Sequence, residues 1–327
     1  MTEFSFDVRL LLLIAAIVLD ALVGDPDWLW RRLPHPVTWF GALIGLCDRT
    51  FNRETASTGL RRAAGVAVVI VLVAIAWFAG VLVERLVTLL PYGFVLIPVI
   101  ASVFLASRSL YDHVARVLNA FHSGGLEDAR KAVSMIVGRD PDSLDKAGVT
   151  RAAIESTAEN FSDGVVAPGF WFAVFGLPGL FAYKMINTAD SMIGHRSTRH
   201  EAFGWAAARL DDLVNLPASR LAGFLIAMAA PFVGGTIKQS FVTMLDDARK
   251  HRSPNAGWPE AAMAGALGIA LAGPRRYGER VVEDPFLNDG GRHEAGPGDI
   301  GRALKILRVA TAGGAILTLI LWLYLHT

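Results

Sequence analysis

Residues 63 to 90 read AAGVAVVIVLVAIAWFAGVLVERLVTLL, an apolar run broken only by Glu84 and Arg85 near its end. A helix of this length is long enough to cross about 30 Å of hydrocarbon. The turn PYG at 91 to 93 follows, and a second apolar run, FVLIPVIASVFLA, occupies 94 to 106. Two apolar runs joined by a tight turn predict a transmembrane hairpin, and this hairpin decides the fold class.

The composition of the whole chain agrees with membrane embedding. Of its 327 residues 53% are hydrophobic and only 19% are charged, with a mean hydropathy of +0.42, which is too apolar for an ordinary soluble domain. The 31 Lys and Arg residues against 30 Asp and Glu residues leave a charge of +1, so we expect no nucleic-acid partner. Because Cys47 is the one cysteine, an intramolecular disulfide and a CxxC site are excluded.

Four further apolar segments complete the predicted fold. Residues 8 to 23 and 309 to 325 are predicted to span the membrane. Residues 165 to 182 and 221 to 237 contain several Gly and Pro residues, which favour broken or re-entrant helices, although plain spans stay an alternative. The sequence thus predicts an all-α polytopic membrane protein with about four spanning helices and two broken segments. We expect one integral membrane domain, 1–327, with cytoplasmic excursions at 24–62, 107–164, 183–220 and 238–308.

The orientation follows from the basic residues. Arginines and lysines gather before the hairpin and before the last span, where cytoplasmic loops carry their positive charge. They are Arg31, Arg32, Arg49, Arg53, Arg61 and Arg62 in the first loop, and Arg275, Arg276, Arg280, Arg302, Lys305 and Arg308 in the second. We therefore expect a multi-pass protein of the cell membrane whose polar site faces the cytoplasm.

The segment 141 to 164 predicts a helix with an acidic face. Asp142 is a candidate N-cap and Gly164 a candidate end. At helical spacing the polar residues fall opposite Ile154. They are Glu155, Ser156, Glu159, Asn160 and Asp163. Carboxylates at this spacing repel one another, so either the face is solvated or a cation such as Mg²⁺ lies between them.

A second polar stretch, YKMINTADSMIGHR, occupies 183 to 196. Lys184, Asn187 and Asp190 share one helical face, and a basic turn with His195 and Arg196 follows. A lysine, an amide and a carboxylate beside basic residues suit a nucleotide with its metal ion. No GxxxxGK[ST] or GxGxxG motif is present, so a phosphate site here is not a P-loop.

Three smaller groups of polar residues remain. Arg209, Asp211, Asp212 and Asn215 predict either a structural ion-pair network or a binding site. Asp25 and His35 lie in the first loop, after Asp20 within an apolar run. Arg249 belongs to a basic, Pro- and Gly-containing loop that could bind phosphate or anchor the chain at the membrane surface.

Taken in order, these segments resemble the adenosylcobinamide-phosphate synthase family of cobalamin biosynthesis, known as CobD or CbiB. The resemblance covers nearly the whole chain. It is carried by LDALVGDP at 19 to 26, HPV at 35 to 37, SMIVGRD at 134 to 140, ESTAENFSDGVVAP beginning at Glu155, YKMINTADSMIGHR at 183 to 196, FGWAAARLDDLVNLPASR at 203 to 220 and DARKHRSPNAGWPEAAMAGAL at 247 to 267.

The resemblance implies an ATP-dependent acid–amine ligase. It implies that (R)-1-aminopropan-2-ol, or its O-phosphate, is joined to the free propionate of adenosylcobyric acid, with ATP as co-substrate and Mg²⁺ as cofactor. Our working hypothesis assigns three sets of roles. It takes Glu155, Glu159, Lys184 and Arg196 as catalytic, Asp25, His35, Asn160, Asn187, Arg249 and Asp212 as substrate-binding, and Glu155, Glu159, Asp163 and Asp190 as metal ligands.

Two other functions stay open at this point. The AmpE-like membrane proteins are distantly similar and would make the chain a regulator or sensor, but a sensor has no evident need for so many clustered carboxylates. Broken helices also describe secondary transporters, although no inverted repeat is visible. Homo-oligomerisation and contact with other enzymes of the corrinoid pathway are equally open.

Overall fold

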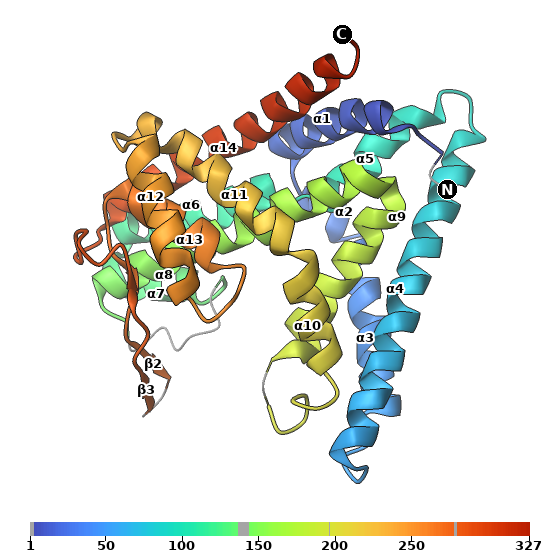
Figure 1. Ribbon diagram of the computed structural model, residues 1–327, viewed down its shortest axis with the longest axis horizontal. Helices are drawn as coiled ribbons and strands as arrows, with labels where there is room; N and C mark the ends of the chain where they lie inside the picture. The colour runs from blue at the N-terminus through green and yellow to red at the C-terminus, as the bar shows by residue number, and fades with distance from the viewer. Residues whose placement is uncertain (1–2, 137–143, 196, 278–279) are drawn as a thin grey trace. The chain divides into compact units, whose positions relative to one another are not determined.

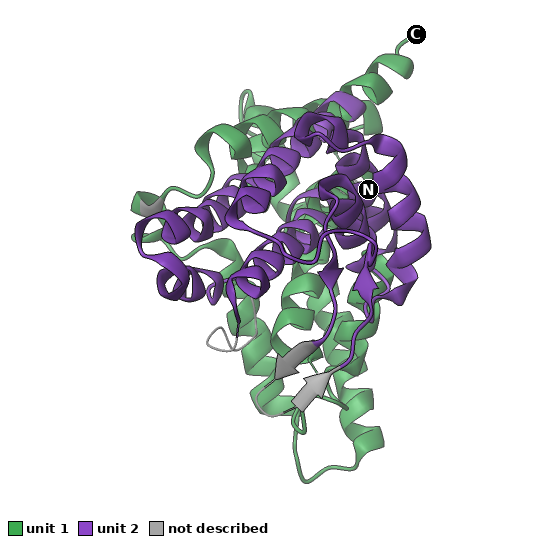
Figure 2. Ribbon diagram, turned by 90° about the vertical axis from the view of Figure 1, so that its left-hand side faces the viewer, with its two compact units in different colours: residues 1–105, 167–215, 318–327 green, residues 106–166, 216–317 purple. Residues whose placement is uncertain are grey.

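The computed structural model describes residues 3–136, 144–195, 197–277 and 280–327, and these divide into two compact units (Figure 2). Unit 1 contains Met1–Leu105, Ala167–Asn215 and Thr318–Thr327, and unit 2 contains Ala106–Val166 and Leu216–Leu317. The chain thus passes between the two units four times, after residues 105, 166, 215 and 317.

Unit 1 is built around the long helix α4, Thr58–Thr88, which packs along α9, Ala167–Ala189 (Figure 1). The Ser57 hydroxyl caps α4 by accepting the backbone N–H of Leu60, at 3.3 Å. Buried apolar side chains of α4, α9 and their neighbours, such as Leu72, Phe172 and Leu180, form one core. The other elements of unit 1 are α1 Phe6–Val23, α2 Asp27–Trp30, α3 Pro36–Phe51, η1 Gly93–Val95, α5 Leu96–Ser102, η4 Asp190–Gly194 and α10 Trp205–Val214.

The predicted break in the segment 165 to 182 is confirmed within α9. Gly176 has φ +67°, a left-handed value that interrupts the helix, and Pro178 follows it. The buried Glu84 of α4 accepts the backbone N–H of Leu177 at 2.8 Å. A carboxylate from the neighbouring helix thereby satisfies a backbone donor that the break exposes.

Unit 2 is built around its central helix α13, Gly257–Leu267, whose residues are nearly all buried. Its Ala and Gly residues let α8, Lys146–Phe161, α11, Leu216–Ala229, and α12, Ile237–Asp247, pack against it. Two short antiparallel pairs, β1 with β4 and β2 with β3, follow α13. The remaining elements are α6 Ser107–Ser123, α7 Gly125–Val133, η3 Ser162–Val166, η5 Ala230–Val233, η6 Ala248–Lys250, β1 Leu271–Ala272, β2 Arg275–Tyr277, β3 Arg280–Val282, β4 Phe286–Leu287 and α14 Pro297–Tyr324.

The predicted class, an all-α polytopic membrane protein, is confirmed. Five helices in the described residues are long and apolar enough to cross a membrane, against about four expected with two broken segments. They are Thr58–Thr88, Gly93–Ser123, Lys146–Gly194, Leu216–Val233 and Pro297–Tyr324. The N-terminal run forms α1 as expected, but it is not among the five, and it carries Asp7, Arg9 and Asp20.

Both ends predicted for the acidic helix are corrected by the structure. Asp145, not Asp142, is the N-cap of α8, and its carboxylate accepts the N–H of Gly148 at 2.6 Å; Asp142 lies outside the described residues. Gly164 does not end the helix, because its φ is not positive and the chain continues through the π-helical turn η3 into α9. The Gly164 carbonyl accepts the N–H of Ala106 at 3.0 Å.

Candidate functional site

The first candidate site lies in unit 1, where α9 and η4 meet α10. The Tyr183 hydroxyl donates to Asn215 at 3.0 Å, and the Asn215 amide donates to Asp211 at 2.9 Å. The Asn187 amide approaches the other Asp211 oxygen at 3.5 Å. We call this group, with Asp190 and Asp212, the acidic cluster. It brings together residues from the second and third polar stretches of the sequence.

The electrostatics of the acidic cluster favour a bound cation. Asp211 is only 9% exposed, and burial together with repulsion from Asp190 raises its pKa from 3.8 to about 7, against the stabilising hydrogen bonds from Asn215 and Asn187. Burial also raises the pKa of Asp212, although Arg209 lies 3.6 Å away and opposes the rise. A positive ion in the cluster would remove this repulsion.

Asp190 and Asp211 fit the requirements of Mg²⁺ in a nucleotide site. Such an ion needs only one or two protein carboxylates, since phosphate oxygens and water complete its shell. The buried Asp211 carboxylate, whose oxygens lie 2.9 and 3.5 Å from the neutral amides of Asn215 and Asn187, is the observation that supports the fit. Sequence spacing alone is consistent with either a structural or a binding role for Asp211, because spacing along the chain does not reveal burial.

The metal ligands predicted from sequence divide between the units. Asp190 belongs to unit 1, whereas Glu155, Glu159 and Asp163 belong to unit 2. Within the residues that the structure describes, no group of three or more His, Cys, Asp or Glu side chains is arranged to hold a metal ion. The four-carboxylate assignment therefore stays a prediction.

In unit 2, α8 differs from the expected two-faced helix. Glu155 is only 3% exposed, and its carboxylate accepts the N–H of Ala272 at 2.7 Å. Ser156 is also buried and donates to the carbonyl of Ile136 at 3.0 Å. Of the five polar residues, only Glu159 and Asn160 are exposed, and Asp163 is half-buried in η3. Glu155 and Ser156, two residues of the predicted polar arc, are therefore packed inside unit 2.

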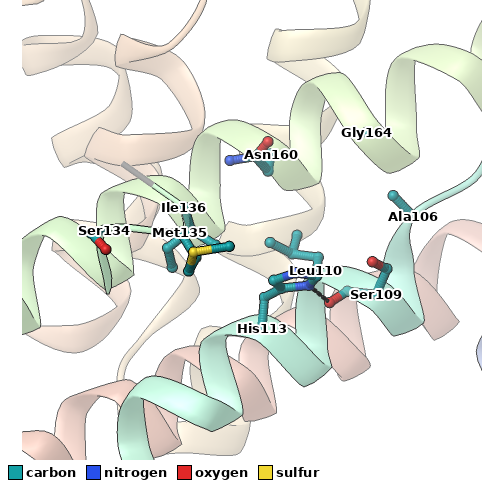
Figure 3. Close-up of a pocket in the computed structure, with 9 residues that line it drawn as sticks. All are labelled: Ala106, Ser109, Leu110, His113, Ser134, Met135, Ile136, Asn160 and Gly164. Carbon is teal, nitrogen blue, oxygen red and sulfur yellow. Dashed lines mark hydrogen bonds between the residues drawn. The ribbon is translucent and has the colours of Figure 1, made fainter. Parts of the chain in front are cut away.

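A cavity of about 410 Å³ lies beside this helix in unit 2 (Figure 3). Asn160 of α8 and His113 of α6 lie on the two helices that border the cavity. Ser134 and Ile136, which follow α7, also line it. The cavity also has Ala106, Ser109, Leu110, Met135 and Gly164 in its lining. His113 and Ser109 are not among the candidate site residues predicted from the sequence, because no motif or spacing singles them out.

The structure brings Asp25 and His35 together in unit 1. The His35 Nε2 lies 3.7 Å from an Asp25 oxygen, and Trp30 donates its indole N–H to the same oxygen at 3.2 Å. The Nδ1 of His35 accepts the N–H of Val37 at 3.2 Å and so caps α3. This pair thus has a structural role, and its role in binding substrate stays a prediction.

The predicted phosphate-binding cations are spread along the chain. Lys184 is half-buried on α9 in unit 1, and Arg249 is exposed on η6 in unit 2. Arg196 lies outside the described residues.

A further charged group of unit 1 was not foreseen from sequence. Asp48 of α3 accepts two bonds from Arg199, at 2.9 and 3.1 Å, and lies 3.5 Å from His200. Burial works against ionisation of Asp48, but hydrogen bonds from Asn52 and Arg199 hold its pKa below 3.8. These residues are about 150 positions apart in sequence, so no local pattern could have paired them.

The family profile and the similar proteins of known name indicate the same family. The profile of the family described as CobD/Cbib protein matches residues 13–307. A protein of Sinorhizobium fredii, named Cobalamin biosynthesis protein CobD, is 54% identical over 318 residues, which cover 94% of this chain and 97% of that protein. Proteins of the same name from Rhizobium meliloti and Rhodobacter capsulatus are 53% and 48% identical, covering 92% and 95% of this chain and 93% and 98% of their own lengths.

No solved structure matches the chain. The family profile and the relatives nevertheless span nearly its full length, and the relatives are about half identical to it. The chain therefore belongs to the CobD/CbiB family of cobalamin biosynthesis proteins.

Proposed function

We propose that this protein is an ATP-dependent acid–amine ligase that joins (R)-1-aminopropan-2-ol, or its O-phosphate, to the free propionate of adenosylcobyric acid. The observation that carries the proposal is the acidic cluster, in which the buried Asp211 carboxylate lies 2.9 and 3.5 Å from the neutral amides of Asn215 and Asn187. Such a cluster favours a divalent cation, and nucleotide-dependent ligation needs one to hold phosphates. Membership of a cobalamin biosynthesis family supports the corrinoid substrate.

The chemistry explains why each component is needed. A carboxylate is a poor acylating agent, so ATP first converts the propionate to a phosphate or adenylate ester. Mg²⁺, held by Asp190 and Asp211, would neutralise negative charge on the phosphates. Asn187 and Asn215 keep the Asp211 carboxylate oriented through its two oxygens. The incoming ammonium must lose a proton before its nitrogen can attack the activated carbon.

The site is proposed to face the cytoplasm at the cell membrane, where ATP is available. Five candidate spans support the membrane location, and the basic loops support the orientation. Family membership favours this ligase over an AmpE-like regulator or a secondary transporter.

The direct test is an assay of the purified protein in detergent or lipid nanodiscs. Adenosylcobyric acid, ATP, Mg²⁺ and either amine should give an amide product by mass spectrometry, and no product without ATP. Release of ADP would indicate acyl phosphate, and release of AMP would indicate acyl adenylate. Absence of amide with both amines would refute the proposal, and ATP-independent uptake of substrate into vesicles would favour a transporter.

Asp211→Asn should lower the rate of amide formation by at least about 10²-fold, because the neutral amide does not balance the charge of a divalent cation. Asp289→Asn is a suitable control, since Asp289 is exposed and belongs to the other unit. Full activity of Asp211→Asn would exclude the acidic cluster from the reaction.

A further inference from the structure

The loop of residues 195–204 joins the two elements of unit 1 that carry the acidic cluster, and we call it the connecting loop. It follows η4, which contains Asp190, and leads into α10, which contains Asp211 and Asp212. The structure describes this loop except for Arg196. Because each end of the loop continues into a cluster element, the contacts that hold the loop constrain how Asp190 lies relative to Asp211.

The two ends of the connecting loop touch through backbone atoms. A Cβ added at Gly204 would overlap the carbonyl oxygen of Ile193, so a side chain there would push the two ends apart. Gly204 also donates its N–H to the carbonyl of His200 at 2.7 Å. At the first end, a Cβ added at Gly194 would overlap a carboxylate oxygen of Asp190. The Asp190 carboxylate therefore lies against the backbone where the loop begins, and η4 lies against the start of α10.

The side chain of Arg199 ties the middle of the connecting loop to α3. Its Nη2 and Nε atoms donate to one Asp48 oxygen at 2.9 and 3.1 Å. The Asp48 side chain is only 13% exposed, and its other oxygen lies 3.5 Å from Nε2 of His200. Charge-assisted hydrogen bonds are stronger than neutral ones, and low exposure reduces their screening by salt. The contact with Asp48 therefore restrains the loop firmly.

The main chain of Arg199 is held as well. Its carbonyl oxygen accepts the side-chain amide of Asn52 at 3.0 Å and a guanidinium N–H of Arg61. Arg61 also donates to Asn52 at 2.9 Å, and Asn52 donates to Asp48 at 2.8 Å. Arg61 belongs to α4, which packs against both α3 and α10 in unit 1 (Figure 1). We call Asp48, Asn52, Arg61 and Arg199 the loop anchor.

We propose that Arg199, held by Asp48, is a positioning residue that keeps η4 and α10 in the arrangement in which Asp190 and Asp211 bind one divalent cation. This inference rests on the proposed ligase function, which places a cation at these carboxylates, and it adds the residues that set their geometry. Mg²⁺ requires nearly octahedral ligands at about 2.0–2.1 Å, so a small shift of one carboxylate lowers its affinity. Loss of the anchor should weaken cation binding although both carboxylates remain.

Two variants separate positioning from local charge. Asp48→Asn removes the charge that Arg199 binds, whereas Arg199→Lys keeps the positive charge but loses the pair of donors that reach one oxygen. We expect each variant to weaken cation binding about tenfold, the lower end of the range for residues that orient metal ligands. A purely electrostatic effect of the anchor would leave Arg199→Lys unchanged.

Glu54→Gln is the matched control. Glu54 lies 3.0 Å from the same guanidinium, but its side chain is 65% exposed, so this ion pair restrains the loop little. The substitution removes the same negative charge as Asp48→Asn beside the same arginine. We expect its cation affinity to match that of wild type.

Binding of Mn²⁺ to the purified protein measures the cation affinity without turnover. The EPR signal of the free ion falls as the protein binds it, and Asp211→Asn identifies the part of the binding that belongs to the acidic cluster. The titration is made at pH 8, above the pKa of about 7 of Asp211, and without nucleotide, which would itself bind Mn²⁺. In the ligase assay, both anchor variants should also raise the Mg²⁺ concentration for half-maximal rate about tenfold, with a smaller change in the KM for the amine.

The outcomes distinguish this inference from the ligase proposal. Mn²⁺ binding that both anchor variants weaken and Glu54→Gln preserves would support positioning, and if wild type then forms no amide, only the ligase proposal fails. Anchor variants that bind Mn²⁺ as wild type does would overturn the inference, even where amide is formed. Wild type that binds no more Mn²⁺ than Asp211→Asn would overturn it too. If Asp48→Asn does not fold, Arg199→Lys decides the outcome.

Discussion

At the scale of single residues, Asp211 shows how burial changes the meaning of a carboxylate. Along the sequence it is one acidic residue among several near Arg209. In the fold its hydrogen bonds come from the neutral amides of Asn187 and Asn215, and Asp190 repels its charge. A carboxylate in these surroundings resists ionisation, which makes it sensitive both to pH and to any cation that binds.

The stability of the protein should therefore depend on pH through Asp211. Its pKa is about 7 in the folded protein and 3.8 for an ordinary exposed aspartate, so unfolded chains ionise first as pH rises. The contribution of neutral Asp211 to the free energy of unfolding is fully present below pH 3.8. It falls between pH 3.8 and about 7, and the free energy of unfolding stays lower above pH 7. The Asp211→Asn variant does not lose stability in this pH range, because its amide does not ionise. We expect the variant to gain on the order of 2–4 kcal/mol relative to wild type between pH 5 and pH 8.

Thermal unfolding of both proteins, without nucleotide or divalent cation, measures this gain. The Tm difference between Asp211→Asn and wild type should be larger at pH 8 than at pH 5. Added Mg²⁺ and ATP should raise the Tm of wild type at pH 8 more than that of the variant. A Tm difference that does not change with pH would contradict the predicted ionisation.

At the scale of elements, the break in α9 creates a contact between α9 and α4, both in unit 1. Gly176 adopts a left-handed φ, and Glu84 from α4 accepts the backbone N–H that follows it. A side chain at position 176 would also contact the Glu84 carboxylate. The backbone conformation at position 176 therefore requires a glycine, and the absence of a side chain there leaves the space that the buried Glu84 carboxylate occupies.

Gly176→Ala should destabilise the protein by more than the backbone strain of an alanine at φ +67° and ψ −152°, which is about 1–3 kcal/mol. The extra loss arises because the methyl group displaces Glu84 from Leu177. Gly24→Ala is the matched control, because Gly24 has nearly the same backbone conformation, φ +62° and ψ −145°, against φ +67° and ψ −152° at Gly176. Equal Tm losses for the two variants would show that the Glu84 contact contributes nothing.

At the scale of the whole molecule, membrane sidedness is the property that the proposed ligase depends on most. The basic loops predict that residues near Glu54 and Arg252 face the cytoplasm, while the hairpin turn at Tyr92 faces the other side. All three side chains are exposed in the structure. The single native cysteine makes this arrangement measurable.

Single cysteines at positions 54, 92 and 252, placed in a Cys47→Ala background, test the sidedness. A membrane-impermeant maleimide should label Tyr92→Cys in intact cells, and Glu54→Cys and Arg252→Cys only in inverted vesicles. Labelling of positions 54 and 252 from opposite faces would refute one shared cytoplasmic site.

The helical membrane class, a break in the segment 165 to 182 and the family can be predicted from sequence, because hydropathy, backbone preference and long motifs are local properties of the chain. Helix ends are predicted less well: the sequence indicates an end at Gly164, but this residue lies within a helix that continues. Which polar groups meet depends on the tertiary fold. Glu155 is bound by Ala272, 117 residues away, and Asp211 by Asn187, 24 residues away. Such pairs depend on how distant segments pack, and burial then raises the pKa of Asp211.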